Sequence, residues 1–270
     1  MRLFGRNAQR QLGSALPPAA KDDPIHVRIR DLHKSYGGQH VLRGVSLDVH
    51  RGKTNLVIGP SGSGKTVLMR QLVRLEKPDS GHLWVNGIDF ARLEGLELAA
   101  MRRTFGMVFQ MSALFDSMSV FDNVAFPLIE HTRLSRREVT DRVMARLSAL
   151  GVAGAAHKLP AELSGGMQKR VAVARAMILE SEILIYDEPT TGLDPITTEM
   201  VDDLIVETEE MFGVTSIVIS HDMASVMRIA NYLSFLHEGR IVASGTKEEL
   251  LESKHPATAE FVRASRIMLD

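Results

Sequence analysis

The sequence predicts an α/β fold with a parallel-sheet core, an antiparallel β subdomain in its N-terminal part and an inserted helical subdomain. Apolar residues alternate along 25–29 and again along 45–49, a spacing typical of half-buried antiparallel strands. The short apolar runs 56–58 and 183–186 are typical of strands that a parallel sheet buries on both faces. After the first run, apolar residues recur at helical spacing along 67–75. Strand followed by helix in this order indicates the parallel core.

Composition and charge exclude several function classes. The chain has 270 residues, of which 44% are hydrophobic and 24% charged, so it can bury a sizeable core. Because it has no cysteine, disulfide scaffolds, thiolate zinc sites, iron–sulfur clusters and cysteine nucleophiles are excluded. A net charge of −1 gives no overall field that would attract nucleic acid. No apolar run approaches the roughly 18 residues that span a bilayer, so we expect another chain to cross any membrane involved.

Residues 59–66 match the phosphate-binding P-loop pattern, two glycines separated by four residues and then a lysine and a hydroxyl residue. Glycines let backbone N–H groups curve around phosphate oxygens, and the N-terminus of the next helix favours negative charge. Lys65 is predicted to reach the β- and γ-phosphates and Thr66 to ligate Mg²⁺. A purely structural glycine turn is the alternative. The predicted nucleotide-binding residues are Gly59, Pro60, Ser61, Gly62, Ser63, Gly64, Lys65 and Thr66.

The apolar run 183–186 ends in two acidic residues. Carboxylates at the carboxyl end of a buried parallel strand lie where ligands bind in doubly wound folds. We expect Asp187 to hold the Mg²⁺ shell and Glu188 to polarise a water molecule for attack on the γ-phosphate, as a general base. The alternative is an acidic pair that only caps the next segment.

Residues 163–170 read LSGGMQKR and stand about twenty residues before the acidic strand end. By itself, a Ser-Gly-Gly at the start of a helical stretch is only another anion-binding helix N-terminus. In this position, however, the segment resembles the signature motif of ABC-transporter ATPase subunits, and the resemblance covers residues 25–250. It implies the ABC ATPase fold, a P-loop NTPase with a RecA-like core.

One signature residue departs from the family pattern. The fifth position is most often glutamine in the family, and here it is Met167. Ser164, Gly165 and Gly166 still supply the anion contacts, so we expect them to bind ATP across a dimer, whereas the effect of Met167 on rate and coupling is open.

The resemblance implies roles for four further residues. Tyr36 resembles the aromatic residue that stacks on adenine, although an isolated turn tyrosine is the structural alternative. Gln110 resembles the glutamine that touches Mg²⁺ or the attacking water. Asp194, in Gly-Leu-Asp, resembles the D-loop aspartate of the dimer interface. His221 follows a strand-like run and resembles the switch histidine at the γ-phosphate, although a histidine after a strand is usually only a surface residue.

The resemblance also implies cofactors and partners. It implies ATP and Mg²⁺ as ligands, hydrolysis to ADP and phosphate, and a head-to-tail pair of copies in which the signature residues of one complete the ATP site of the other. With one P-loop, one signature and no sustained heptads, the chain favours the motor subunit of a transporter bound to a transmembrane permease. A soluble ABC ATPase without a channel and a nucleotide-binding regulator without turnover are the alternatives.

The stretch 112–128 resembles the ATPases of the Mla and Mce lipid transporters, which move phospholipid between the two membranes of a diderm envelope. This resemblance implies an Mce-type lipid-binding subunit, a small regulatory subunit as a further partner, and a place on the cytoplasmic face of the inner membrane. It also implies a role in outer-membrane lipid asymmetry. An importer of another substrate is the alternative, and a buried core explains the composition without any function.

We expect four regions along the chain. Residues 1–24 are basic and predict a mobile extension, with organelle targeting or a basic arm near a membrane surface as alternatives. Residues 25–250 form the ATPase domain, with the helical subdomain inserted at about 111–165, and 251–270 form a C-terminal helical extension. The acidic group Glu207, Glu209 and Glu210 is predicted to be a solvated helix face rather than a metal site.

Overall fold

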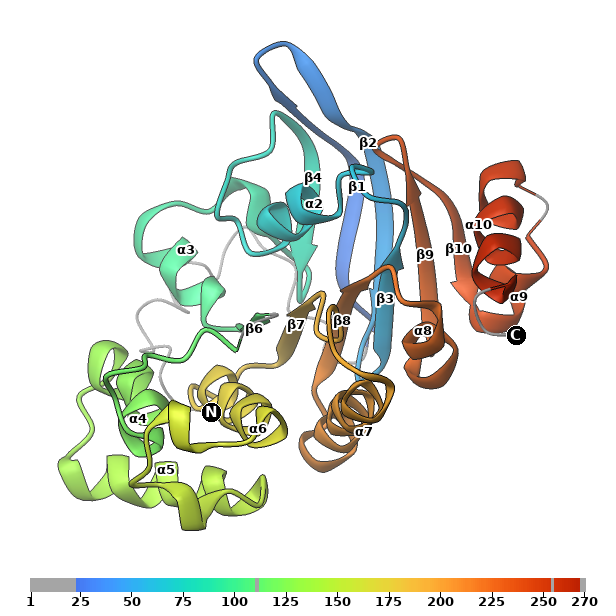
Figure 1. Cartoon of the computed structure of the whole chain (residues 1–270). Helices are drawn as coiled ribbons and strands as arrows, with labels where there is room; N and C mark the ends of the chain where they lie inside the picture. The colour runs from blue at the N-terminus through green and yellow to red at the C-terminus, as the bar shows by residue number, and fades with distance from the viewer. Residues whose placement is uncertain (1–22, 110–111, 254, 268–270) are drawn as a thin grey trace.

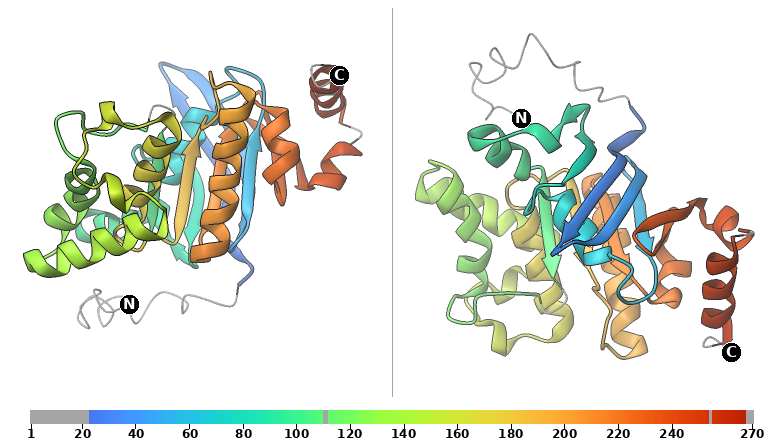
Figure 2. Two further views of the ribbon diagram at one scale, coloured as in Figure 1. Left: turned by 60° about the horizontal axis from the view of Figure 1, so that its bottom comes forward. Right: turned by 90° about the horizontal axis from the view of Figure 1, so that it is seen from above.

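The computed structural model describes residues 23–109, 112–253 and 255–267. Apart from Asp23 and Pro24, the predicted extension 1–24 therefore lies outside the described residues. Within the described part, two β-sheets lie side by side and helices surround them (Figures 1 and 2).

A six-stranded sheet forms the centre of the described structure, in the order β10-β9-β3-β8-β7-β6. All neighbouring pairs except β10 with β9 are parallel, which confirms the predicted parallel core. Every residue of β3 and β8 is buried, which explains their continuous apolar runs. The strands are β3 (Thr54–Ile58), β6 (Phe105–Phe109), β7 (Ile183–Asp187), β8 (Thr215–Ser220), β9 (Tyr232–His237) and β10 (Arg240–Thr246).

The two faces of this sheet contribute to different cores. Leu56 and Ile58 of β3 pack in one cluster with helices of the later part of the chain, whereas Val57 packs in a second cluster. Successive side chains of a strand point to opposite faces, so β3 anchors both cores. The second cluster also contains Leu68 of α2 (Lys65–Leu72), the helix that follows the P-loop.

An antiparallel sheet in the order β2-β1-β4-β5 adjoins the second core. Val27 and Ile29 are fully buried and lie opposite Val49 and Leu47, as alternation predicted. Tyr36 ends β1 directly before the turn at 37–38, because the strand pairs with β2 as far as this residue. The strands are β1 (Ile25–Tyr36), β2 (Gln39–His50), β4 (Ser80–Val85) and β5 (Ile88–Asp89).

Three helices pack together beside the parallel sheet, at the lower left of Figure 1. They are α4 (Val120–His131), α5 (Arg136–Ala149) and α6 (Gly165–Met177). Each begins at a serine whose hydroxyl accepts a hydrogen bond from a backbone N–H in the first turn: Ser119, Ser135 and Ser164. Such caps fix where the helices start. The single-turn helices η2 (Ala153–Ala155) and η3 (Pro160–Glu162) connect α5 to α6.

The remaining helices lie around the two sheets. The helix α3 (Gly95–Arg102) precedes β6, and η1 (Phe90–Arg92) follows β5. The helices α7 (Pro195–Phe212) and α8 (Met223–Ile229) flank β8 in the chain.

A hairpin of β9 and β10 closes one edge of the parallel sheet. The chain then forms α9 (Lys247–Leu251) and α10 (Pro256–Ile267). Phe261 of α10 packs on Phe235 of β9, with ring centroids 5.0 Å apart, which anchors the terminal helix to the sheet. None of the helices in the described ranges is long and apolar enough to cross a membrane.

Candidate functional site

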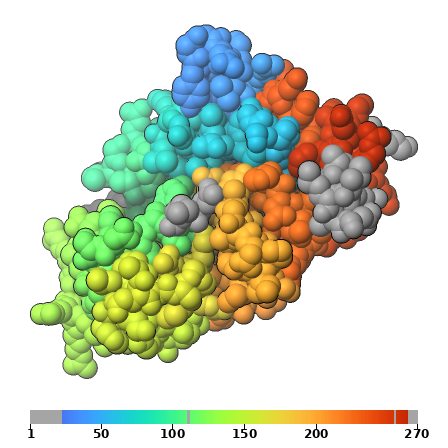
Figure 3. All heavy atoms as spheres, in the orientation of Figure 1, coloured from blue at the N-terminus to red at the C-terminus, as the bar shows by residue number. Residues whose placement is uncertain are grey.

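Three neighbouring parallel strands end beside one another and carry most of the predicted site. The strand β8 lies between β3 and β7, and all three run in the same direction. Their carboxyl ends lead into the P-loop, into Asp187 and Glu188, and into His221. Figure 3 shows that the segment after β7 lies next to the segment of α2 on one face of the molecule. The predicted residues therefore share the sheet edge where ligands bind in this class of fold.

The P-loop bends through conformations that favour glycine. Gly59 has a φ of +158°, and a Cβ on it would lie 2.1 Å from the carbonyl oxygen of Leu236. Gly64 has a φ of +108° and forms the N-cap of α2. Ser61 and Gly62, which lie between these two glycines, are exposed. A glycine-rich bend of this kind before a helix is typical of a phosphate cradle, because its backbone N–H groups can curve around an anion.

The cation of the P-loop is held inside this cradle. Lys65 is 8% exposed, and its Nζ donates hydrogen bonds to the carbonyl oxygens of Gly59 (2.8 Å) and Pro60 (3.2 Å). Burial lowers the pKa of Lys65, whereas the charges of Glu188 and Asp187 raise it. Next to it, the buried Oγ of Ser63 has no hydrogen-bond partner among the described residues. A partly desolvated ammonium and an unsatisfied hydroxyl both fit a phosphate ligand.

The oxygen ligands that Mg²⁺ prefers are also present at this edge. Burial raises the pKa of Asp187, the charge of Glu188 acts in the same direction, and Lys65 opposes them. Thr66, the second residue of α2, is exposed. A carboxylate and a hydroxyl fit a hard divalent cation, which would offset the repulsion between the neighbouring acids.

Glu188 and His221 meet across the ends of β7 and β8. Nδ1 of His221 lies 2.8 Å from Oε2 of Glu188, and the hydroxyl of Thr191 donates to the same oxygen at 2.9 Å. Glu188 has a φ of +47°, which is uncommon for a residue with a side chain, and its N–H donates to the carbonyl of Ile219. Neighbouring backbone thus holds Glu188 in an unusual conformation, a feature often found at functional sites.

Gln110 lies outside the described residues. The residue before it, Phe109, ends β6 and lies opposite Asp187 in the register of β6 and β7. Position 110 therefore directly follows the strand that pairs with β7, the strand that ends in Asp187.

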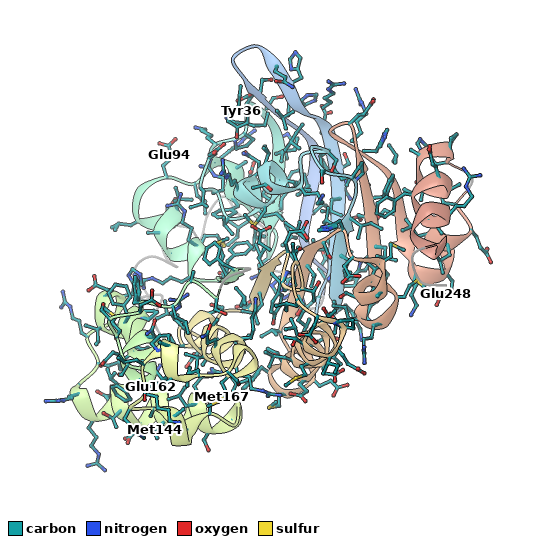
Figure 4. The ribbon with its side chains drawn as sticks, viewed as in Figure 1. Tyr36, Glu94, Met144, Glu162, Met167 and Glu248 are labelled. Atoms are coloured by element: carbon teal, nitrogen blue, oxygen red, sulfur yellow. The ribbon has the colours of Figure 1, made fainter. Side chains whose placement is uncertain are left out.

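Tyr36 lies near the top of Figure 4, and Glu76 links it to α2, because this carboxylate also accepts a hydrogen bond from Arg70. Tyr36 is 40% exposed and its hydroxyl donates a hydrogen bond to Glu76. Nζ of Lys34 lies 5.4 Å from the ring centroid. The ring is fixed at its hydroxyl and remains accessible, which fits a stacking surface.

The signature residues lie at another part of the molecule. Ser164 caps α6 by accepting a hydrogen bond from the N–H of Met167 at 3.4 Å, and both Ser164 and Gly165 are exposed. Figure 4 shows Met167 beside the helices α4 to α6, away from α2. A Cβ on Gly166 would lie 3.3 Å from Cε of Met200. This arrangement leaves the signature motif open to a second molecule.

Asp194 starts α7 rather than joining the acidic pair. Its Oδ1 accepts hydrogen bonds from the N–H groups of Ile196 (3.0 Å) and Thr197 (3.1 Å). The hydroxyl of Thr197 donates a third hydrogen bond, to Oδ2 at 2.5 Å, and this bond above all, together with the backbone bonds, lowers the pKa of Asp194. The residue is exposed, so it can face another chain while it caps the helix.

Two positions near the site were missed by the sequence analysis. Nζ of Lys169 is buried and donates a hydrogen bond to the carbonyl of Pro189 at 3.2 Å, which joins α6 to the loop after Glu188. The guanidinium of Arg175 donates to the carbonyls of Ser112 (3.0 Å) and Ala113 (2.7 Å), just after position 110. A cation within the apolar helical run 171–178 is the sequence signal that could have indicated Arg175, whereas Lys169 precedes this run and has no such signal.

Comparison with known proteins identifies the family. Residues 42–191 match the protein family described as "ABC transporter". The chain is 39% identical over 237 residues to the intermembrane phospholipid transport system ATP-binding protein MlaF of Haemophilus influenzae, covering 88% of this chain and 90% of the relative.

Two further relatives carry other names. The chain is 35% identical over 243 residues to the probable ribonucleotide transport ATP-binding protein mkl of Mycobacterium leprae, covering 90% and 70% of the two chains. It is 39% identical over 261 residues to the chloroplastic protein TRIGALACTOSYLDIACYLGLYCEROL 3 of Arabidopsis thaliana, covering 90% and 75%.

Solved structures share the fold. The cbiO1 protein of Clostridium perfringens, part of an ABC transporter complex, superposes with a TM-score of 0.80 at 28% identity, covering 92% of this chain and all of that one. The cassette MJ0796, solved as a dimer in a post-hydrolysis state with ADP and Pi, gives a TM-score of 0.70 at 31% identity, covering 82% and 98%. The chain therefore belongs to the ABC transporter family, as an ATP-hydrolysing, ATP-binding subunit.

Proposed function

We propose that the chain is the motor of a transporter that moves phospholipid between the inner and outer membranes and so maintains the lipid asymmetry of the outer membrane. The ATP-hydrolysing part of this proposal rests on the contact between Glu188 and His221 beside the P-loop. The lipid part rests on the similarity to the MlaF protein, over almost the full length of both chains.

In this proposal, the P-loop holds the phosphates of ATP through its backbone N–H groups and through Lys65. The Mg²⁺ ligands would be Thr66, Gln110 and Asp187. When bound, the ion would neutralise part of the negative charge of the phosphates. Glu188 orients a water molecule and accepts its proton as the water oxygen attacks the γ-phosphorus and the bond to the ADP oxygen breaks. His221 holds the carboxylate of Glu188 in position and contacts the γ-phosphate.

A second copy of the chain completes each ATP site. Ser164 is exposed and caps α6, a helix that lies away from α2 in Figure 1, so its anion contacts would serve the partner's nucleotide. Asp194 lies at the start of α7 and would form part of the same interface. Tyr36 would stack on adenine. ATP then joins two copies, and hydrolysis lets the pair reopen and reset a permease.

The proposed position in the cell and the proposed partners are those that the resemblance to the Mla and Mce ATPases implies. We place the chain as a peripheral subunit on the cytoplasmic face of the inner membrane, bound through a transmembrane permease, with an Mce-type lipid-binding subunit and a small regulatory subunit. Residues 25–250 would form the ATPase domain, with a helical subdomain at about 111–165 and a C-terminal helical extension at 251–270.

A second candidate is an importer ATPase for another substrate. The name of the Mycobacterium leprae relative, which refers to ribonucleotide transport, favours this alternative at a similar coverage of the chain. Because the substrate is selected by the membrane subunits, the two candidates share the ATP site and differ only in partners.

The first test is a purification of the tagged chain from its native membranes in mild detergent, followed by identification of co-purifying chains and extracted lipid. A multi-spanning permease with an Mce-type subunit and phospholipid would support the proposal. A soluble solute-binding protein in their place would support the importer, and ribosomes or DNA-repair proteins would overturn a transport role.

A second test uses the purified complex in vesicles that contain fluorescent phospholipid. We expect ATP-dependent movement of the lipid to a protein acceptor in the native complex. The matched control is the complex with Glu188→Gln, which should bind ATP and move no lipid. Equal lipid movement in both complexes would contradict the coupling of hydrolysis to transport.

A further inference from the structure

The last three residues of β1 extend past the end of the neighbouring strand β4. The pairing of these two strands stops where His33 lies opposite Ser80, so among the described strands Lys34, Ser35 and Tyr36 pair only with β2. A strand end with one free edge is easily displaced unless other groups bind its backbone. This strand end carries Tyr36, the ring proposed above to stack on adenine. The groups that hold the strand end therefore decide where the ring lies.

One residue of the loop before β4 takes the place of the missing strand partner. Asp79 directly precedes Ser80, and its Oδ2 accepts a hydrogen bond from the backbone N–H of Ser35 at 2.7 Å. The backbone N–H of Asp79 donates to the carbonyl oxygen of His33 at 3.0 Å. A carboxylate oxygen thus accepts the N–H that the carbonyl of a longer β4 would have accepted. Asp79 therefore fixes the backbone directly before Tyr36.

The same carboxylate also holds a cation over the ring. Nζ of Lys34 donates hydrogen bonds to Oδ1 of Asp79 at 3.0 Å and to the carbonyl oxygen of Lys77 at 2.9 Å. This Nζ lies over the ring of Tyr36, 5.4 Å from the ring centroid. An ammonium at this distance is attracted by the negative face of an aromatic ring. Because Lys34 lies over one face, a base would stack on the other.

The loop that contains Asp79 is tied to the helix of the P-loop. Oε1 of Glu76 accepts a hydrogen bond from the guanidinium of Arg70 at 3.2 Å, and its Oε2 accepts one from the hydroxyl of Tyr36. Arg70 lies in α2, the helix that follows the P-loop. The loop therefore connects the ring proposed to bind the base to the helix proposed to bind the phosphates. A fixed separation between two subsites favours a ligand that occupies both, because less free energy is lost to ordering on binding.

We propose that Asp79 is a positioning residue for ATP binding, which holds Lys34 and Ser35 so that Tyr36 presents one face to adenine at a fixed distance from the P-loop. Asp79 itself does not touch the nucleotide. Its effect passes through the ring of Tyr36, so it concerns the binding of the base and leaves the binding of the phosphates unaffected. Its contacts do not use the hydroxyl of Tyr36. This inference rests on the stacking role proposed above for Tyr36.

The test compares two ligands of the purified full chain by titration calorimetry. One is a non-hydrolysable ATP analogue, and the other is inorganic tripolyphosphate, which has the phosphates but no base. In Asp79→Ala we expect the Kd of the analogue to rise about three- to tenfold, the usual effect of losing a hydrogen bond, and the Kd of tripolyphosphate to stay unchanged. The control Glu94→Ala removes an exposed acid that pairs with Lys77 of the same loop, and both Kd values should stay unchanged. An unchanged Kd of the analogue in Asp79→Ala, or an equal rise for both ligands, would overturn the proposal.

A double variant separates the role of Asp79 from that of Tyr36. If Asp79 acts through the ring, Tyr36→Ala with Asp79→Ala should bind the analogue as weakly as Tyr36→Ala alone. A further loss of the size seen in Asp79→Ala would overturn the positioning role of Asp79 alone, whereas native affinity in Tyr36→Ala would refute the stacking role itself.

A second single variant keeps the inference testable if Asp79→Ala does not fold. Lys34→Met removes the cation that Asp79 holds over the ring of Tyr36, and it should weaken binding of the analogue without weakening that of tripolyphosphate. Any other pattern in Lys34→Met would contradict the proposal.

Discussion

Oε2 of Glu188 lies 2.8 Å from Nδ1 of His221, although 33 positions separate the two residues in the chain. The contact exists because β7 and β8 are adjacent and parallel, so their carboxyl ends lie side by side. Thr191 donates to the same oxygen, and neither contact uses Oε1. Glu188 is therefore held at one oxygen while the other can orient water.

Replacement of Glu188 by Gln should abolish most of the hydrolysis and preserve ATP binding. The amide keeps the shape of the side chain but cannot accept the proton of the attacking water, and general-base catalysis contributes about 10²–10⁴-fold. Steady-state hydrolysis and nucleotide binding, measured on the same preparation, would show the separation. Glu207→Gln, at an exposed residue paired with Arg170, is the matched control and should hydrolyse ATP normally. Undiminished turnover in Glu188→Gln would remove this residue from the reaction.

Replacement of Lys65 by Ala should weaken ATP binding itself. The ammonium is largely buried beside the phosphate cradle, and loss of one partner of a buried charge pair costs about 2–5 kcal/mol. The Kd for ATP from a fluorescence titration should rise by at least about tenfold, by the same estimate. Lys53→Ala, at an exposed lysine in the turn before β3, is the control and should leave the Kd unchanged. An unaltered affinity in Lys65→Ala would contradict the phosphate role.

Two substitutions at Tyr36 separate stacking from hydrogen bonding. Tyr36→Ala should lose about 1–3 kcal/mol of ATP binding, the usual value for a base on an aromatic ring. Tyr36→Phe removes only the hydrogen bond to Glu76 and should retain most of the affinity. If Ala and Phe weaken binding equally, or if neither changes it, the ring does not stack on adenine.

Gly59→Ala should destabilise the fold. The added Cβ would lie 2.1 Å from the carbonyl oxygen of Leu236, at a φ that residues with side chains rarely adopt. Overpacking of this kind costs about 1–3 kcal/mol, which a urea melt can resolve. Gly165→Ala is the control, because its Cβ meets open space at the start of a helix. A Gly59→Ala protein as stable as the control would mean that the backbone at Leu236 can move aside.

Asp202→Asn should make folding stability less dependent on pH. Burial raises the pKa of Asp202 from 3.8 to about 7, so the native state binds more protons than the unfolded state between these values. The stabilising effect of the neutral acid is therefore complete below pH 3.8 and is lost as pH rises through 7. Relative to Asp202→Asn, the native chain should lose up to about 4 kcal/mol between pH 4 and 8. The free energy of unfolding of both proteins is measured across this range. If it changes with pH equally in the native chain and in Asp202→Asn, the carboxyl is solvated and the prediction is wrong.

The order of motifs along the chain was enough to predict the core of the fold and the strand ends at which the candidate site residues lie. The P-loop, the acidic pair and the signature are short linear patterns whose local geometry depends on a few neighbouring residues. The buried runs of β3 and β7 identified parallel strands, because only a sheet covered on both faces tolerates such continuous apolar sequence. These features needed no knowledge of distant contacts.

Other features depended on contacts that no local pattern encodes. The pairing of Tyr36 with Glu76 and the burial of Lys169 arise between segments far apart in the sequence. The same holds for Asp202, which reads as an ordinary polar residue of α7 and whose pKa rises to about 7 because the folded chain buries it. The sequence by itself determined which chemical groups the chain carries and the strand ends that present them. The tertiary structure decided which of those groups lose water and which charged groups lie close to one another, since burial and charge proximity are properties of the packed chain.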